Sequence, residues 1–148
     1  MLVVWTPNAE CRNSGLDRGC TRTAQTESNM NDLLTLAVKE TNDAYLFSGV
    51  HAQLVLVHSE LVQYTEASSN AFSSALDHIS DATDGIIDDV HNLRSQYGAD
   101  IVSMIIDDSQ YCGLGYLGPF KQFMFSVTAW NCATGYYSFG HGKLIGLI

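Results

Sequence analysis

Three short and uninterrupted apolar runs predict strands that are buried on both faces. They occupy residues 2–6, 54–58 and 101–106. Between the first two runs, apolar side chains recur at helical spacing over residues 26–47, which predicts a helix. Ser28 or Thr26 is expected to cap the start of this helix. The pair Ser48 and Gly49 predicts its end.

Two more helices are expected between the second and third strands. Residues 71–80 carry apolar side chains on one helical face. Asp84 is expected to cap the next helix, and Gly98 to end it. The apolar face of that helix consists of Ile86, Val90, Leu93 and Tyr97. Residues 8–21, which hold two glycines and two cysteines, are expected to form a loop.

This order of strands and helices predicts one α/β domain with a mostly parallel sheet, because continuous apolar strands need cover on both faces. No repeat or low-complexity linker divides the chain. Towards the C-terminus we expect a strand over residues 123–128, followed by a helix that contains His141. Residues 112–118 read CGLGYLG and, on their own, indicate only a loop.

The composition fits a folded and acidic protein. Of its 148 residues, 46% are hydrophobic and 16% are charged, which is enough apolar material for a core. The net charge of −9 argues against nucleic acid and anionic membranes as partners. No apolar run reaches the roughly 18–20 residues of a membrane-spanning helix. The N-terminal MLVVWTP lacks the basic residues of a signal peptide and is expected to begin the first strand.

Four cysteines stand in two local pairs, Cys11 with Cys20 and Cys112 with Cys132. No C-x-x-C motif is present, so a zinc ribbon or a thioredoxin-type site is not indicated. The even count favours two disulfides within these pairs and an oxidising compartment. Four cysteines permit three pairings, and buried free thiols in a cytosolic protein stay open as the alternative.

Side chains that could bind a metal are scattered along the chain. The histidines without metal-ligand spacing, which we expect to be structural or exposed, are His51, His58, His78 and His91. Asp107 and Asp108 follow a strand, at the end of a sheet where α/β proteins often bind ligands. An integrin-type D-x-S-x-S site is not indicated, because Tyr111 stands where the second serine belongs.

Four segments carry a resemblance to a known family. They read VVWTP, ETNDAYLFSGV, VHNLRSQYGADIVSMIIDDSQYCGLGYLG and FSVTAWNCATGYYSFGH. Together they resemble the reprolysin-like zinc metalloendopeptidases of the metzincin clan. The resemblance implies a three-layer α/β sandwich, with a mostly parallel five-stranded sheet, one antiparallel edge strand and an active-site helix at the C-terminus. Residues 1–148 would then be the upper, N-terminal subdomain of the catalytic domain, without the lower subdomain.

In this family the antiparallel edge strand binds an extended peptide substrate by strand addition. Residues 114–117 occupy the matching place. The resemblance assigns substrate binding to Gly113, Leu114, Gly115, Tyr116, Leu117 and Gly118. The free N–H and C=O groups of an edge strand are suited to this kind of binding.

The zinc motif of the family, H-E-x-x-H-x-x-G-x-x-H, is broken in this chain. His141 matches the first zinc ligand, but Gly142 stands at the general-base position and Ile145 at the second ligand position. A catalytic zinc normally has three protein ligands, so His141 alone is not expected to hold zinc stably. No catalytic residue is left. Because the agreement ends abruptly at His141, we expect a frame change or a misassigned gene end.

Two functions are compatible with this reading. The family implies a zinc-dependent endopeptidase that acts on extended peptides or proteins, with this chain inactive because its motif breaks after His141. The alternative is a catalytically dead homologue that still binds peptides along its edge strand. The resemblance and the paired cysteines also imply an extracellular protein.

Overall fold

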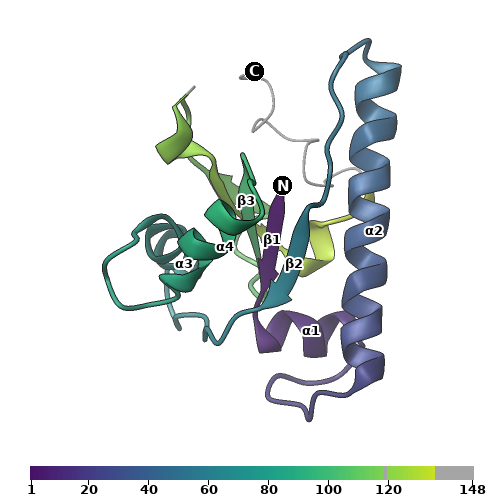
Figure 1. The fold of residues 1–148 in the computed structure, drawn as a ribbon. Helices are drawn as coiled ribbons and strands as arrows, with labels where there is room; N and C mark the ends of the chain where they lie inside the picture. Colours follow the sequence, from purple (N-terminus) through teal and green to yellow (C-terminus); the bar gives the residue numbers. More distant parts are fainter. Residues whose placement is uncertain (119, 136–148) are drawn as a thin grey trace.

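The computed structural model describes residues 1–118 and 120–135 and contains a five-stranded sheet between two layers of helices (Figure 1). The strands are β1 (Leu2–Trp5), β2 (His58–Leu61), β3 (Val102–Ile106), β4 (Gly113–Gly115) and β5 (Phe125–Ala129). They lie in the order β2-β1-β3-β5-β4, and β4 alone runs antiparallel to its neighbour. The expected α/β fold with one antiparallel edge strand is confirmed. The helix expected around His141 lies outside the described residues.

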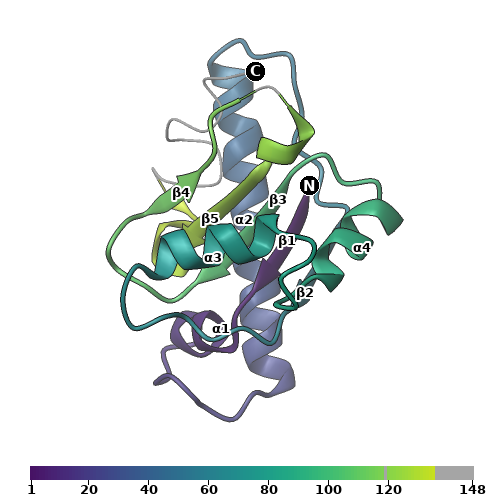
Figure 2. The same ribbon diagram turned by 90° about the vertical axis from the view of Figure 1, so that its left-hand side faces the viewer.

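Helices cover both faces of the sheet. They are α1 (Pro7–Asn13), α2 (Ala24–Phe47), α3 (Ala71–Ser80) and α4 (Asp89–Gln96), with the short 3-10 turns η1 (Lys121–Phe123) and η2 (Trp130–Cys132). In Figure 1, α2 lies on one side of the sheet and α3 and α4 on the other, and Figure 2 shows α3 crossing in front of the strands. No helix in the described part of the chain is long and apolar enough to cross a membrane.

The central position of β1 in the sheet explains why its sequence is continuously apolar. Val3 and Trp5 belong to the core on the α2 side, whereas Leu2 and Val4 belong to the core on the α3 side. Successive side chains of a strand point to opposite faces, so a central strand covered on both faces needs apolar residues throughout. The strands predicted at residues 2–6 and 101–106 are confirmed within one residue.

Helix α2 begins earlier than its apolar pattern indicated. Thr23 is the N-cap, and its hydroxyl accepts a hydrogen bond from the backbone N–H of Thr26 at 3.2 Å. The hydroxyl of Thr26 in turn accepts from the backbone N–H of Thr23 at 3.0 Å, which completes a capping box. The expected cap at Ser28 or Thr26 is therefore wrong. The expected end is confirmed, with Ser48 as the C-cap.

The second strand was predicted too early. Residues 54–58 are apolar, but Val55 is 54% exposed and Val57 is 39% exposed, so this run is not buried on both faces. The strand is β2, which is half-buried throughout and pairs only with β1. As the edge of the sheet, β2 tolerates polar residues that a central strand would exclude. The apolar run therefore predicted a strand in the segment that directly precedes β2.

Two helix boundaries also differ from the sequence pattern. Pro7 opens helix α1 inside the expected loop, with Thr6 as the N-cap, because proline is well suited to the first helical position. Asp84 does not cap α4, which starts five residues later. Instead, the carboxylate of Asp84 accepts from the backbone N–H of Ile86 at 2.7 Å and pairs with His78. Ile86 thus lies outside the helix.

Gly98 ends α4 in a left-handed conformation, with φ at +62°. A Cβ at this position would have nothing within 4 Å, so only the backbone conformation resists a larger residue. We expect Gly98→Ala to lower the free energy of unfolding by about 1 kcal/mol. Urea unfolding measures this change, with Gln96→Ala on the exposed side of the same helix as the control. Equal stability of the two variants would contradict the explanation.

Candidate functional site

β4 forms the edge of the sheet opposite β2 and, among the described residues, pairs only with β5. The register joins Gly113 to Thr128, Leu114 to Val127 and Gly115 to Ser126. The backbone N–H of Ala129 donates to the carbonyl of Cys112 at 3.0 Å. Because hydrogen-bonded and non-hydrogen-bonded pairs alternate in an antiparallel ladder, the N–H and C=O groups of Gly113 and Gly115 face away from β5. Two glycines therefore present their backbone on the open side.

Three contacts hold β4 in place. A disulfide joins Cys112, directly before β4, to Cys132 in η2 after β5. Leu114 and Tyr116 pack against the core on the α3 side. The hydroxyl of Tyr116 lies 3.0 Å from that of Ser80 at the end of α3. The edge strand is therefore tied to the sheet from two directions, while no strand of the described residues pairs with its outer side.

The expected edge segment extends beyond the observed strand. Residues 114–117 were predicted as the strand, whereas β4 comprises Gly113–Gly115. Leu117 is 72% exposed. Gly118 has φ at +157°, and a Cβ there would lie 2.5 Å from the ring of Phe123, so glycine alone fits. The strand is short because the chain turns towards Phe123 after Tyr116.

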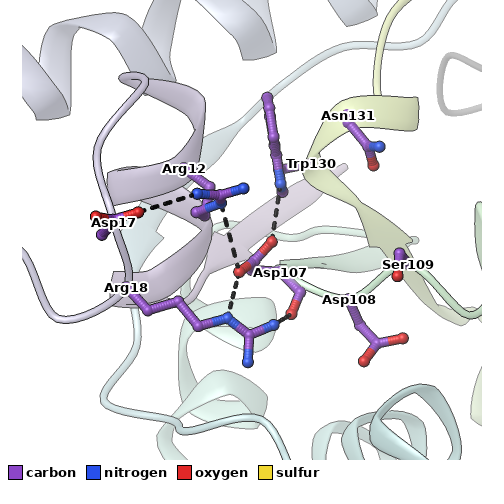
Figure 3. Close-up of a pocket in the computed structure, with 8 residues that line it drawn as sticks. All are labelled: Arg12, Asp17, Arg18, Asp107, Asp108, Ser109, Trp130 and Asn131. Atoms are coloured by element: carbon purple, nitrogen blue, oxygen red, sulfur yellow. Dashed lines mark hydrogen bonds and ion pairs between the residues drawn. The ribbon is translucent and has the colours of Figure 1, made fainter.

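A cavity of about 510 Å³ opens at the carboxyl ends of β3 and β5 (Figure 3). Its lining residues are Arg12, Asp17, Arg18, Asp107, Asp108, Ser109, Trp130 and Asn131. The sequence had placed Asp107 and Asp108 at such a position, where parallel sheets often bind ligands. The arginines come from α1 and the loop after it, which sequence reasoning left without a role.

The carboxylate of Asp107 already accepts hydrogen bonds from other side chains of the protein. Its carboxylate accepts from Nε of Arg18 at 2.5 Å and from the indole N–H of Trp130 at 3.0 Å, and Arg18 also donates to its backbone carbonyl at 2.6 Å. The hydrogen bond with Asp107 raises the pKa of Arg18. The carboxylate of Asp108 accepts from the backbone N–H of Gln110. This arrangement locks the loop after α1 onto the sheet and does not resemble a metal site.

Two buried glutamates lie behind this cavity, and the sequence had marked neither. Glu66 accepts hydrogen bonds from the hydroxyl of Thr6, from the amide of Asn8 at 2.7 Å and from the backbone N–H of Asp107 at 3.0 Å. Glu10 is completely buried. Glu66 joins segments 41–60 residues apart, and Glu10 joins β1, α1 and α2, so no pattern within one element could have revealed either.

Among the four histidines of the described residues, His51 is exposed and His91 packs against Phe125 with its buried Nε2 unpaired, whereas the other two have polar or ring partners. His58 stacks on Tyr97 with 3.9 Å between ring centroids, and His78 lies 2.7 Å from a carboxylate oxygen of Asp84. Within residues 1–118 and 120–135, no group of three or more His, Cys, Asp or Glu side chains could hold a metal ion. The positions of the broken zinc motif, His141, Gly142 and Ile145, lie outside the described residues.

Both expected disulfides are present, Cys11–Cys20 and Cys112–Cys132. Among the described residues no cysteine is free. The first disulfide closes the loop that carries Arg18, and the second fixes β4. Disulfides persist in oxidising compartments, so the two bonds are consistent with an extracellular protein.

Comparisons with known proteins agree with the architecture. No family model matches the chain. It is 39% identical over 114 residues to the peptidyl-Asp metalloendopeptidases of Stenotrophomonas maltophilia strains R551-3 and K279a, and 38% identical to that of Xanthomonas campestris pv. campestris. These matches cover 76% of this chain and 27% of each relative, so the chain spans about a quarter of the length of its relatives.

A solved structure described as a chaperone-substrate complex shares the fold, with a TM-score of 0.61 and 22% sequence identity. That match covers 87% of this chain and 22% of the other. At this identity, the likeness concerns the fold alone. The identity to the bacterial enzymes is much higher and extends over three quarters of the chain. Over that part of its length, the chain is a homologue of metalloendopeptidases.

Proposed function

We propose that this chain is the substrate-binding upper part of a zinc metalloendopeptidase of the reprolysin-like type, and that the longer protein cleaves peptides at aspartyl residues. The identity to peptidyl-Asp metalloendopeptidases supports the activity and its specificity. The observation that carries the proposal is the open edge of β4, because an endopeptidase must hold its substrate in an extended conformation.

Gly113 and Gly115 provide the binding surface. Their outward N–H and C=O groups would pair with an extended peptide lying alongside β4. Without side chains beyond hydrogen, these two residues allow the peptide backbone to approach closely. Because the contacts are to backbone atoms, this edge positions many sequences, and preference for one side chain must come from other parts of the protein.

The chain supplies only part of a zinc site. The relatives are metalloendopeptidases, and His141 would be one zinc ligand in such an enzyme. The described residues supply no further ligand group, and Gly142 cannot act as a general base. Without these groups the chain cannot carry out the hydrolysis, and we expect it to be inactive by itself.

A second candidate is a binding module without catalysis. Gly142 at the general-base position and the intact edge of β4 favour it. Both candidates predict peptide binding, whereas only a complete metalloendopeptidase would cut. The paired disulfides favour an extracellular place of action for either.

The test uses the 148-residue chain and a quenched fluorescent peptide that contains aspartate, with added zinc. We expect the peptide to bind and to remain uncut. Cleavage that a chelator abolishes would overturn the inactivity of this chain and support the complete enzyme. Absence of any peptide binding would overturn the role of β4 in both candidates.

We expect Gly115→Pro to weaken peptide binding about fivefold, the equivalent of roughly 1 kcal/mol. Proline removes the outward N–H of Gly115, which takes no part in the ladder with β5. Titration with a fluorescent peptide measures the loss. Leu117→Pro is the matched control, because it lies in the same segment outside β4. Equal affinities of the two variants would place the peptide elsewhere.

A further inference from the structure

The connection between α3 and α4 is a mostly exposed segment that contains three aspartates. Residues 81–88, here the α3–α4 loop, read DATDGIID and contain no helix or strand. Residues 81–86 are exposed. Figure 2 shows α3 and α4 on the outer face of the sheet, so this loop projects away from the strands. A peptidase can reach such a segment without opening the core.

We propose that the α3–α4 loop is the site at which an aspartyl-directed metalloendopeptidase cuts this chain, at a peptide bond of Asp81, Asp84 or Asp88. Hydrolysis adds water across that bond: the carbonyl carbon gains the hydroxyl, the C–N bond breaks and the nitrogen takes the proton. The cutting enzyme is a separate metalloendopeptidase, so the susceptibility of the loop does not depend on any activity of this chain.

The hydrogen bonds of the loop are short in range. Asp81 accepts from the backbone N–H and the hydroxyl of Thr83, and Asp88 accepts from the backbone N–H of Gly85 at 3.2 Å. An extended substrate conformation would break these turns and leave the sheet ladders intact. Ile87 has φ at +56°, an unfavourable value for a β-branched residue, and extension would relieve it. Two contacts oppose opening, the pair of Asp84 with His78 and the packing of Ile87 against the core on the α3 side, but no hydrogen bond of the sheet has to break.

The other aspartates are protected. Helical aspartates are Asp32, Asp43, Asp77 and Asp89. Asp107 is buried, and its carbonyl, in the peptide bond to Asp108, accepts from Arg18. The carbonyl of Asp100 accepts from Arg94 at 2.6 Å, one residue before Ile101 binds to β1. Asp17 is exposed but lies within the loop closed by Cys11–Cys20. Asp108 is half-buried, and its segment is held four residues later by the disulfide of Cys112. The α3–α4 loop combines three aspartates with exposure over residues 81–86.

A cut in this loop has a distinctive consequence. It separates β1 and β2 from β3, β4 and β5, and each disulfide stays within one fragment. The fragments are joined without a covalent bond, by packing, by the parallel pairing of β1 with β3 and by polar contacts such as those of Arg18 and Glu66 with Asp107. They should therefore remain together in native buffer and separate in denaturant without reduction. A cut at Asp17 would behave differently, because Cys11–Cys20 would keep its two ends joined until reduced.

The test incubates the 148-residue chain with the peptidyl-Asp metalloendopeptidase of Stenotrophomonas maltophilia. Non-reducing gels and mass spectrometry then locate the first cut. We expect two fragments that meet within residues 81–88, and no cut when the protease is chelated. A first cut anywhere else would overturn the proposal. Because the added enzyme does the cutting, this result does not depend on any activity of the chain, which the peptide assay tests separately.

Two variants sharpen the test. Asn at all three positions (Asp81→Asn, Asp84→Asn and Asp88→Asn) should slow the first cut about tenfold or more, because the recognised carboxylates are gone. Asp17→Asn is the matched control and should be cut at the wild-type rate. Loss of stability in the triple variant would speed cleavage at other aspartates, so a slower cut cannot come from misfolding. An unchanged rate in the triple variant would overturn the proposal.

Discussion

Replacing Glu10 with alanine is expected to lower the free energy of unfolding by about 3 kcal/mol. The Glu10 carboxylate is fully buried and accepts hydrogen bonds from the indole N–H of Trp5 at 2.8 Å and from the hydroxyl of Thr26 at 2.6 Å. Nε of Arg22 lies 3.0 Å from the same carboxylate. Alanine would leave these donors without a partner and open a cavity between α1, α2 and the sheet.

The measurement is chemical denaturation of Glu10→Ala, Arg22→Ala and the double variant. Arg22 is partly exposed, so its removal alone is expected to have the smaller effect. This double-mutant cycle separates the interaction energy between Glu10 and Arg22 from the loss of the hydrogen bonds that Trp5 and Thr26 donate to Glu10. A loss below about 1 kcal/mol for Glu10→Ala would show that water or neighbouring groups replace its contacts.

The same glutamate makes stability depend on pH. Burial by itself would raise the pKa of Glu10, but hydrogen bonds from Arg22, Thr26 and Trp5 outweigh burial, so the pKa is lowered from 4.5. A lowered native pKa contributes stability that is present above the unfolded pKa and is lost as pH falls through the native pKa. The difference in Tm between the wild type and Glu10→Ala should therefore be full at neutral pH and shrink below about pH 4.5. A constant difference would contradict this linkage.

Replacing Arg94 with alanine should have a comparable effect, about 3 kcal/mol. Arg94 is 7% exposed and donates to the backbone carbonyls of Ala99 at 3.2 Å, Asp100 at 2.6 Å and Lys121 at 3.1 Å. Its guanidinium also lies over the ring of Phe125, 4.8 Å from the centroid. One side chain thus joins the turn before β3 to the turn before β5.

Burial lowers the pKa of Arg94 below its ordinary value, with Asp100 acting in the opposite direction, yet the group stays charged at neutral pH. Arg94→Lys keeps the charge without the planar fork, so it should recover only part of the stability. Arg12→Ala, at a partly exposed arginine, is the control and should change stability by less than about 1 kcal/mol. Full recovery in Arg94→Lys would show that charge alone matters. Urea unfolding of the three variants decides between these outcomes.

Some helices could be predicted from the sequence because they depend on the spacing of nearby residues. The buried residues of helix α2 recur every three or four positions and are mostly apolar, and the end of the helix at Ser48 is likewise marked by local residues. The order of β5 and β4, with the edge strand antiparallel, followed from a resemblance that extends over many segments. The apolar run over residues 54–58 gave a wrong strand position, because Val55 and Val57 are exposed and lie just before the edge strand β2.

The sequence by itself determined most of the elements, though not all of their bounds, because the periods of helices and strands and the cap and turn residues act within a few positions of each other. It also indicated the α/β class, since central strands covered on both faces are apolar throughout. Only the tertiary structure decided that Glu10, Glu66 and Arg94 are buried and satisfied, that Asp107 is engaged by Arg18, and that Gly113 and Gly115 face an open edge. These outcomes join residues distant in the chain, and packing, not spacing, brings such residues together.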